Sequence, residues 1–469
     1  MTDENMGKNN LKKSIKTKDV LALAFGTMIG WGWIMLSGKW AAEAGMAGAM
    51  IAYGVGAVLC IFVGLAYAEL TPAMPYTGGS VVFAYKSLGY WPSVMVGLST
   101  SFAYIGVACW EGPAFASAVD YIVEIPKAGY LWTVQGYEVY FTWALIAILA
   151  AVIITVINVL GAKEAAVFQT VATLGLIIVG LVFLFGGIAF GSVQNTKPFF
   201  TDMKGFSSVL LMVPAMFVGF DVIPQAASEM DVPLSRIPRL LILSIAAAAA
   251  WYILMIMATC LSAPVDVREG GSIPVADAMA FAFGGAIWGK LCILGALCGI
   301  LTSWNGFLYG AARCLYAMSK ARMLPAFLAD IHPRYGTPYK AIILCGVLSV
   351  CACFLGKSAL SWFVNASSFG VVVMYFVVSL SFIFLRKRFP DMPRPYAIKR
   401  FTLVAVGSMF VSLFFLYLYL PMGPSSLIGI EWLFVLGWFI TFGILALMCR
   451  IKNKDLGKEE RWKLLITEE

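Results

Sequence analysis

Residues Gly26 to Ile34, GTMIGWGWI, determine how the rest of the chain is interpreted. Three glycines within seven residues interrupt the apolar segment 20–40, which otherwise has the length and composition of a membrane-spanning helix. Glycine weakens a helix interior, and here it falls where a bilayer would be deepest. A non-helical turn in lipid is tolerated only where its free N–H and C=O groups face protein, water or a ligand. The stretch therefore predicts a broken helix with a binding site at the break.

The composition is that of a polytopic membrane protein. Of the 469 residues, 61% are hydrophobic and 12% are charged, and no polar stretch is long enough for a soluble domain. The predicted fold class is all-α integral membrane, with about twelve transmembrane helices and a short surface helix at 80–88. We expect the spans at residues 18–42, 46–70, 92–122, 141–160, 164–190, 206–228, 238–262, 286–318, 338–355, 359–386, 402–420 and 428–450.

Lysine and arginine are distributed unequally between the two sides that these spans define. The side that includes the N-terminus holds 26 of the 33 basic residues, and the other side holds 7. The positive-inside rule then predicts a multi-pass protein of the plasma (inner) membrane with both termini cytoplasmic, in tails 1–17 and 451–469. The net charge of +8 thus reflects topology and predicts no nucleic-acid partner. The lysine-rich N-terminus lacks a cleavage pattern, so we expect the first span to be retained.

The sixth predicted span contains a second interruption. Its sequence at 212–230, MVPAMFVGFDVIPQAASEM, includes Pro214, Gly219 and Pro224, with Asp221 near the centre. Proline removes a backbone donor and clashes with the preceding turn, so this helix should also be broken. Interrupted helices at matching places in residues 18–190 and 205–388 predict a 5+5 inverted repeat of a transporter. Residues 402–450 would add two further helices.

The two breaks suit a ligand that carries both charges of an amino acid. Free amides near Gly30, Trp31 and Gly32, at the positive end of a half-helix, would bind a carboxylate. Free carbonyls near Ile29 and in the segment 215–218 would bind an ammonium group. The alternative is a helix-packing face, because Gly26 and Gly30 are four residues apart.

Five short motifs occur in order along residues 18–400. They are G-x-x-I-G-x-G at 26–32, E-L with a following P and G-G within 69–79, G-F-[ED] at 219–221, R-x-L-Y-A-M at 313–318, and L-R-x-R-x-P-x-x-P-R-P at 385–395. Together they resemble the amino acid-polyamine-organocation (APC) superfamily of transporters, which have the LeuT-type fold. The resemblance implies a substrate site between the first and sixth spans. The candidate substrate-binding residues are Ile29, Gly30, Trp31, Gly32, Glu111, Ala215, Phe217, Val218, Gly219, Phe220, Asp221 and Trp304.

Two positions depart from the family pattern. Trp31 stands where many relatives have a small hydroxyl residue, and Ala215 stands where relatives often have Trp or Phe over the substrate. We infer that an aromatic wall has been exchanged between helices, which would change substrate choice. The alternative for Trp31 and Trp33 is a lipid-facing or interfacial position.

Two carboxyl groups and one tryptophan in the spans have alternative roles. Glu111 would face a cavity and bind a second substrate amine or a transported proton; alternatively it is a structural carboxyl near Pro113 or lies nearer the outer surface. Asp221 would line the site or act as a gate or protonation switch, as the matching acid does in parts of the family, or cap the inner half of the sixth span. Trp304 would lie against the substrate or pack in the core.

Ion coupling is the point on which the sequence differs most from several proton-coupled relatives. Those relatives have a lysine in the fifth span where this chain has Leu176, and no Lys or Arg lies between residues 164 and 194. We therefore favour exchange or facilitated uptake over lysine-based proton symport. Any proton coupling would have to use Glu111 or Asp221.

Enzyme chemistry is not expected. The one histidine, His332, lies in a predicted loop, and the ten cysteines lack metal or disulfide spacing, so we expect no metal and no cofactor. The predicted function is a secondary active transporter, a permease or exchanger, for an amino acid or an amino-acid-like amine. A polyamine or other organic cation is the alternative substrate, and a channel ranks third. The expected partners are this small-molecule substrate, a proton or an exchanged solute, and the lipid bilayer.

Overall fold

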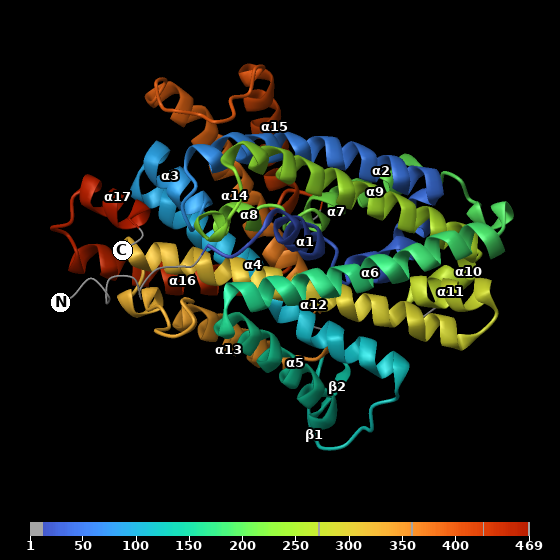
Figure 1. Cartoon of the computed structure of the whole chain (residues 1–469). Coiled ribbons are helices and arrows are strands. Elements are labelled where there is room, and N and C mark those ends of the chain that lie inside the picture. The colour runs from blue at the N-terminus through green and yellow to red at the C-terminus, as the bar shows by residue number, and fades with distance from the viewer. Residues whose placement is uncertain (1–12, 271–272, 358–359, 425, 468–469) are drawn as a thin grey trace.

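The computed structural model describes residues 13–270, 273–357, 360–424 and 426–467. Most of the predicted N-terminal tail, residues 1–12, lies outside these ranges. The helices of the bundle (Figure 1) are α1 (Thr17–Met28), α2 (Gly32–Ala73), α3 (Ser80–Leu88), α4 (Tyr90–Ile122), α5 (Phe141–Leu160), α6 (Ala162–Phe190), α7 (Met203–Met216), α8 (Val222–Gln225), α9 (Ile237–Ser262), α10 (Val265–Gly270), α11 (Pro274–Phe283), α12 (Ala286–Lys320), α13 (Tyr339–Cys353), α14 (Leu360–Arg388), α15 (Phe401–Tyr419), α16 (Gly429–Lys452) and α17 (Lys458–Ile466).

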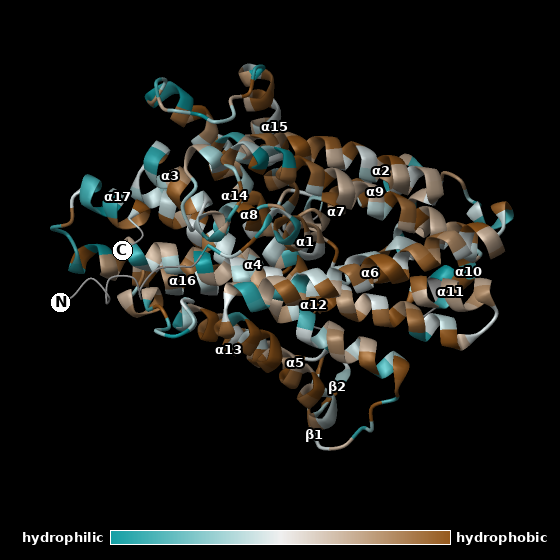
Figure 2. Cartoon of the chain, in the orientation of Figure 1, coloured by the Kyte–Doolittle hydropathy of each residue, from teal (hydrophilic) through white to brown (hydrophobic). Residues whose placement is uncertain are grey.

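Long apolar helices make up most of the bundle, as the composition predicts. Within the described residues, nine helices are long and apolar enough to cross a membrane: α2, α4, α5, α6, α9, α12, α14, α15 and α16. Apolar residues run along these helices, while hydrophilic residues are concentrated toward the ends of the bundle (Figure 2). The all-α membrane fold is thus confirmed. The count of twelve spans and the 5+5 repeat stay predictions, because α1, α7 and α13 have 12, 14 and 15 residues, fewer than the roughly 20 that a helix needs to cross a bilayer.

The first predicted span is broken where its glycines lie. Helix α1 ends at Met28 and α2 begins at Gly32, which leaves three residues between them outside any helix. Helix α2 then continues for 42 residues, with one non-helical residue, Gly45, at φ 77°. A Cβ on Gly45 would lie 2.7 Å from the carbonyl oxygen of Phe199, so only glycine fits this close approach. The kink at Gly45 divides α2 into two helices, and the boundary expected between the first and second spans, after 42 and before 46, lies at this kink.

The sixth predicted span, 206–228, does not form one continuous helix. Helix α7 ends at Met216, residues 217–221 form turns, and α8 is a single helical turn followed by a 3-10 turn at Ala227–Glu229. The break that Pro214, Gly219 and Pro224 predict is thus present, and only the short length of α8 was not expected. Pro214 and Pro224 flank the interruption, and each lacks the N–H that an intact helix needs.

Several short elements outside the long spans had no counterpart in the sequence prediction. They are α10, α11, α17 and a hairpin of β1 (Tyr130–Val134) and β2 (Tyr137–Tyr140), whose strands pair antiparallel. Helix α17 lies within the predicted C-terminal tail and packs against α3 and α12. Figure 1 shows α3 and α17 at one end of the bundle and α10 and α11 at the other. Each element is shorter than the apolar window from which a span is recognised.

Candidate functional site

The two helix breaks lie against each other in the centre of the bundle. A Cβ placed on Gly219 would lie 2.8 Å from the backbone nitrogen of Met28, and Gly219 has φ 132°, which favours glycine. The hydroxyl of Tyr252, on α9, donates a hydrogen bond of 3.0 Å to the carbonyl oxygen of Met28. The break in the first span is thus fixed from one side by the sixth span and from another by α9.

Both breaks leave backbone groups without partners in the described structure. The N–H groups of Gly30 and Trp31 donate no hydrogen bond to any described residue. In the sixth span, the carbonyl oxygens of residues 215–218 accept none of the hydrogen bonds found in the described part of the chain. Unpaired backbone groups inside a protein carry a large free-energy cost unless water or a ligand binds them. The arrangement offers donors for a carboxylate and acceptors for an ammonium group.

A small cavity lies beside the two breaks. The space within it that is open to the centres of water molecules is about 40 Å³, enough for water but too small for an amino acid without side-chain movement. Helices α4, α9, α12 and α14 complete its wall. Five of the residues singled out in the sequence line this cavity: Gly30, Gly32, Glu111, Ala215 and Val218. The other seven do not line it: Ile29, Trp31, Phe217, Gly219, Phe220, Asp221 and Trp304.

Glu111 is the carboxyl group of this cavity. Its side chain is fully buried, and its Oε1 accepts a hydrogen bond from the hydroxyl of Ser303 on α12. Its other oxygen, Oε2, has no hydrogen-bond partner among the described residues. A Cβ on Gly30 would lie 2.8 Å from Ser303 Oγ and 3.1 Å from Glu111 Oε1, so the first-span break packs directly on this pair. The alternatives of a carboxyl bonded to the turn before Pro113, or one near the outer surface, do not fit this position.

Asp221 is also buried, but both of its oxygens are occupied. Tyr104 on α4 donates a hydrogen bond of 2.5 Å to Oδ2, and the N–H of Gly219 donates one of 2.8 Å to Oδ1. Asp221 immediately precedes α8, yet its side chain makes no capping hydrogen bond to that helix. The alternative of an N-cap is therefore wrong. Asp221 instead ties the sixth-span break to α4.

The three tryptophans considered in the sequence, Trp31, Trp33 and Trp304, are buried and do not line the cavity. The side chains of Trp31 and Trp33 are 3% and 0% exposed, so the lipid-facing alternative is wrong for both. Trp33 packs edge to face on Trp251, with ring centroids 5.8 Å apart. Trp304 donates a hydrogen bond of 3.1 Å to Ser349 Oγ and packs toward α4 and α13, which fits the core-packing alternative.

The cavity also contains polar residues that the sequence analysis missed. Ser303 donates a hydrogen bond to Glu111, and Tyr252 donates one to the Met28 carbonyl oxygen. Ser367 and Ser368 on α14 also line the cavity. In the sequence, the feature that could indicate such cavity-lining residues is a small hydroxyl residue inside an otherwise apolar span. That signal is weak, because serine and threonine in spans commonly bond to the preceding helical turn, as Ser368 does to Val364.

Leu176 lies beside the first-span break. Its side chain is fully buried, and a Cβ on Gly299 would lie 2.8 Å from Leu176 Cδ1 and 3.1 Å from the Ile29 carbonyl oxygen. An apolar side chain thus occupies this neighbourhood. The only charged residues of α6 are Lys163 and Glu164 in its first turn.

Comparisons with known proteins identify the family of the chain. The family model described as "Amino acid permease" matches residues 15–461. The chain is 26% identical to the methylthioribose transporter of Bacillus subtilis, over 96% of each chain. It is 28% identical to the branched-chain amino acid permease BcaP of the same organism, over 92% of each chain. It is 27% identical to cationic amino acid transporter 4 of Homo sapiens, over 82% of this chain and 61% of that one. The family match covers nearly the whole chain, and the protein therefore belongs to the amino acid permease family.

Proposed function

We propose that this protein is a secondary active transporter, a permease or exchanger, that moves an amino acid or an amino-acid-like amine across the plasma membrane by alternating access. The observation that carries the proposal is the free oxygen of Glu111 in a buried cavity next to two helix breaks. Both termini are cytoplasmic in this proposal, because the basic residues gather on that side.

The substrate's two charges would bind to backbone groups of the breaks. The N–H groups of Gly30 and Trp31 donate to the carboxylate, and the carbonyl oxygens of residues 215–218 accept from the ammonium group. Glu111 Oε2 then faces the rest of the substrate or a proton. The cavity must enlarge for binding, which alternating access requires in any case.

A polyamine or another organic cation is the second candidate substrate. Such a substrate lacks a carboxylate and would need Glu111 and Asp221 together as counter-ions. The partners of Asp221 disfavour it, because Tyr104 and Gly219 occupy both carboxyl oxygens and Asp221 does not line the cavity. The relatives' names do not narrow the choice, since they include methylthioribose, branched-chain amino acids and cationic amino acids.

Exchange or facilitated uptake remains our proposal for the transport mode. Leu176 places an apolar group next to the first-span break, so no side chain on α6 there acts as a fixed cation. If a proton is coupled to transport, Glu111 is the group with a free oxygen to bind it.

The decisive experiment uses the purified full chain in liposomes. Amino acids, modified amino acids and amines are first screened for an increase in thermal stability, since a ligand that binds the folded state raises it. Each stabilising compound is then loaded inside liposomes, and uptake of its labelled form is measured. We expect saturable uptake that the internal compound accelerates. Linear, non-saturating flux would indicate a channel, and a screen without any stabilising amine would contradict the proposed site.

A further inference from the structure

A second pocket lies at the end of the bundle that includes α3 and α17. Its volume is about 400 Å³, and it shares no lining residue with the cavity at the helix breaks. Its wall is formed by the end of α2, by Lys86 of α3, by the segment 388–392 and by Trp462 of α17. Three stretches far apart in the sequence, 73–86, 388–392 and Trp462, therefore meet around this pocket.

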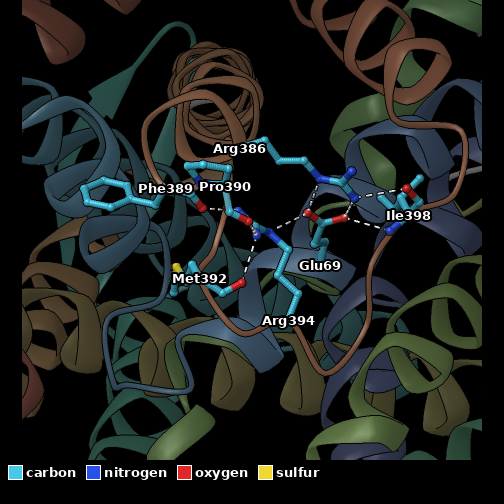
Figure 3. Close-up of polar contacts among 7 residues, drawn as sticks. All are labelled: Glu69, Arg386, Phe389, Pro390, Met392, Arg394 and Ile398. Carbon is cyan, nitrogen blue, oxygen red and sulfur yellow. Dashed lines mark hydrogen bonds and ion pairs between the residues drawn. The ribbon is translucent and has the colours of Figure 1, made fainter.

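Glu69 holds one wall of this pocket in place (Figure 3). Its buried carboxylate accepts two hydrogen bonds from Arg386, of 2.7 and 2.5 Å, and lies 3.3 Å from Nε of Arg394. Arg394 in turn donates hydrogen bonds of 2.8 Å to the carbonyl oxygens of Phe389 and Met392. The loop that follows α14 is thus fixed through a charged network, and the pocket wall is preorganised.

Lys86 projects between two aromatic rings of the pocket. Its Nζ lies 4.8 Å from the ring centroid of Phe389 and 4.6 Å from that of Trp462. Trp462 is itself stacked on Tyr85, at an interplanar angle of 4°. Within the described part of the chain, Lys86 forms no ion pair and no hydrogen bond. A half-buried ammonium group therefore keeps all three N–H donors available.

A second cation with unused donors lines the same pocket. Arg388 donates one hydrogen bond, of 2.7 Å, from Nη1 to the carbonyl oxygen of Ser87. Asp391 is the one carboxylate among the lining residues, and it forms no ion pair with the described residues. Two cations against one carboxylate leave the pocket positively charged. Arg386 and Arg394 do not line the pocket; they share the single carboxylate of Glu69, so this network keeps a net charge of +1 behind the pocket wall.

We infer that this pocket binds the phosphate group of an anionic lipid headgroup. Phosphate oxygens can accept from the free donors of half-buried Lys86 and exposed Arg388, and the rings of Phe389 and Trp462 flank Lys86. The pocket lies where the apolar helices α2 and α14 end, which is the depth at which lipid headgroups lie. Free phosphate has the same chemistry, but it lacks the acyl chains that hold a headgroup at this depth.

A lipid headgroup bound in this pocket would also stabilise the packing of α17 against the bundle. Trp462 is the contribution of α17 to the pocket wall, and Lys86 lies between Trp462 and the loop after α14. A phosphate bound to Lys86 would lower the cost of keeping this ammonium group partly out of water. The C-terminal helix should therefore be better protected when the lipid is present.

The test uses the full chain purified in detergent and titrated with short-chain phosphatidylglycerol, phosphatidylcholine or inorganic phosphate. Bound lipid is counted by native mass spectrometry, and thermal stability is followed in parallel. We expect phosphatidylglycerol to bind and stabilise, while phosphatidylcholine does so weakly. Lys86→Gln and Arg388→Gln should each weaken phosphatidylglycerol binding about fivefold, the effect of one basic residue at an anionic surface. Lys387→Gln, an exposed cation outside the pocket, is the matched control.

Three results would overturn the inference. Equal binding of phosphatidylglycerol to the wild type and the Lys86→Gln variant would remove the site, provided that the variant keeps the wild-type melting temperature without lipid. Equal binding and equal thermal stabilisation by phosphatidylglycerol and phosphatidylcholine would show that the pocket does not select for an anionic headgroup. Stabilisation by inorganic phosphate alone, lost in Lys86→Gln, would show a phosphate site and contradict its lipid source.

Discussion

Gly219 lies so close to the backbone of Met28 that a methyl group on Gly219 would come within 2.8 Å of the Met28 nitrogen. The first-span break and the sixth-span break are thus in direct backbone contact, with no side chain between them. At this contact the chain needs both the positive φ of Gly219 and its missing side chain. Movement of either half-helix must therefore change the environment of the other.

Gly219→Ala tests this contact. The added Cβ meets backbone atoms, which cannot rotate away, and alanine at φ 132° is strained. Overpacking and backbone strain together predict a loss of about 2 kcal/mol or more in stability, with slower transport. The measurement is thermal unfolding of purified protein together with uptake in liposomes. Gly54→Ala is the control, because a Cβ there meets nothing within 4 Å on a regular helix. Equal melting of the Gly219→Ala variant and the wild type would refute the contact.

Glu111→Gln tests the carboxyl group of the cavity. Glutamine keeps the shape of the side chain and can still accept a hydrogen bond from Ser303, so the fold should survive. If the free oxygen binds a cationic group of the substrate or a proton, transport should fall about tenfold or more, the effect of losing about 1.4 kcal/mol of interaction. Uptake kinetics and ligand-induced thermal stabilisation measure this loss. Exposed Glu124 gives the control variant Glu124→Gln. Unchanged uptake of a cationic substrate in Glu111→Gln would exclude Glu111 as its counter-ion.

The sequence was sufficient to predict where the helices break but insufficient to predict where side chains point. Glycine and proline act through the backbone itself, so the breaks near Gly30 and Gly219 follow from local chemistry. Asp221 illustrates the limit. Its position before α8 suggested a cap, yet Tyr104, 117 residues earlier in the chain, donates to its carboxyl group. Such a contact depends on the packing of α4 against the sixth span, which no local pattern encodes.

Whether a cavity residue could be predicted from the sequence also depends on whether its role is local or set by packing between helices. Glu111 could be identified because a charge inside an apolar span needs a partner or a cavity. Its partner Ser303 could not, since a serine in a span satisfies its hydroxyl locally as often as across helices. Trp304 adjoins Ser303 on α12 but, because side chains of successive helical residues point about 100° apart, it faces Ser349 instead.

Tyr104→Phe tests the link between Asp221 and α4. Phenylalanine fills the same volume but leaves Oδ2 of a fully buried carboxyl group without its donor. The expected cost is about 1–3 kcal/mol of stability, the range for a buried polar group that loses its hydrogen bond. Thermal unfolding measures it. Tyr130→Phe is the control, because Tyr130 is 57% exposed and water can replace its hydrogen bond to Thr133. Equal effects of the two substitutions would show that the Tyr104 hydrogen bond contributes no more than a surface contact.

The ion pair between Glu229 and Arg313 should dominate the stability of the end of the bundle near α8. Both side chains are fully buried, with Arg313 donating hydrogen bonds of 2.8 and 3.0 Å, and the Glu229 carbonyl oxygen also accepts from Ser14. Glu229→Gln leaves an uncompensated buried guanidinium group, so we expect a loss of about 3–5 kcal/mol in thermal unfolding. Asp330→Asn breaks an exposed pair with Lys340 and should cost about 1 kcal/mol or less. The double variant Glu229→Gln with Arg313→Gln should lose less stability than the sum of its single changes, because no charge is then left unpaired. Additive losses, or equal melting of Glu229→Gln and Asp330→Asn, would contradict this account.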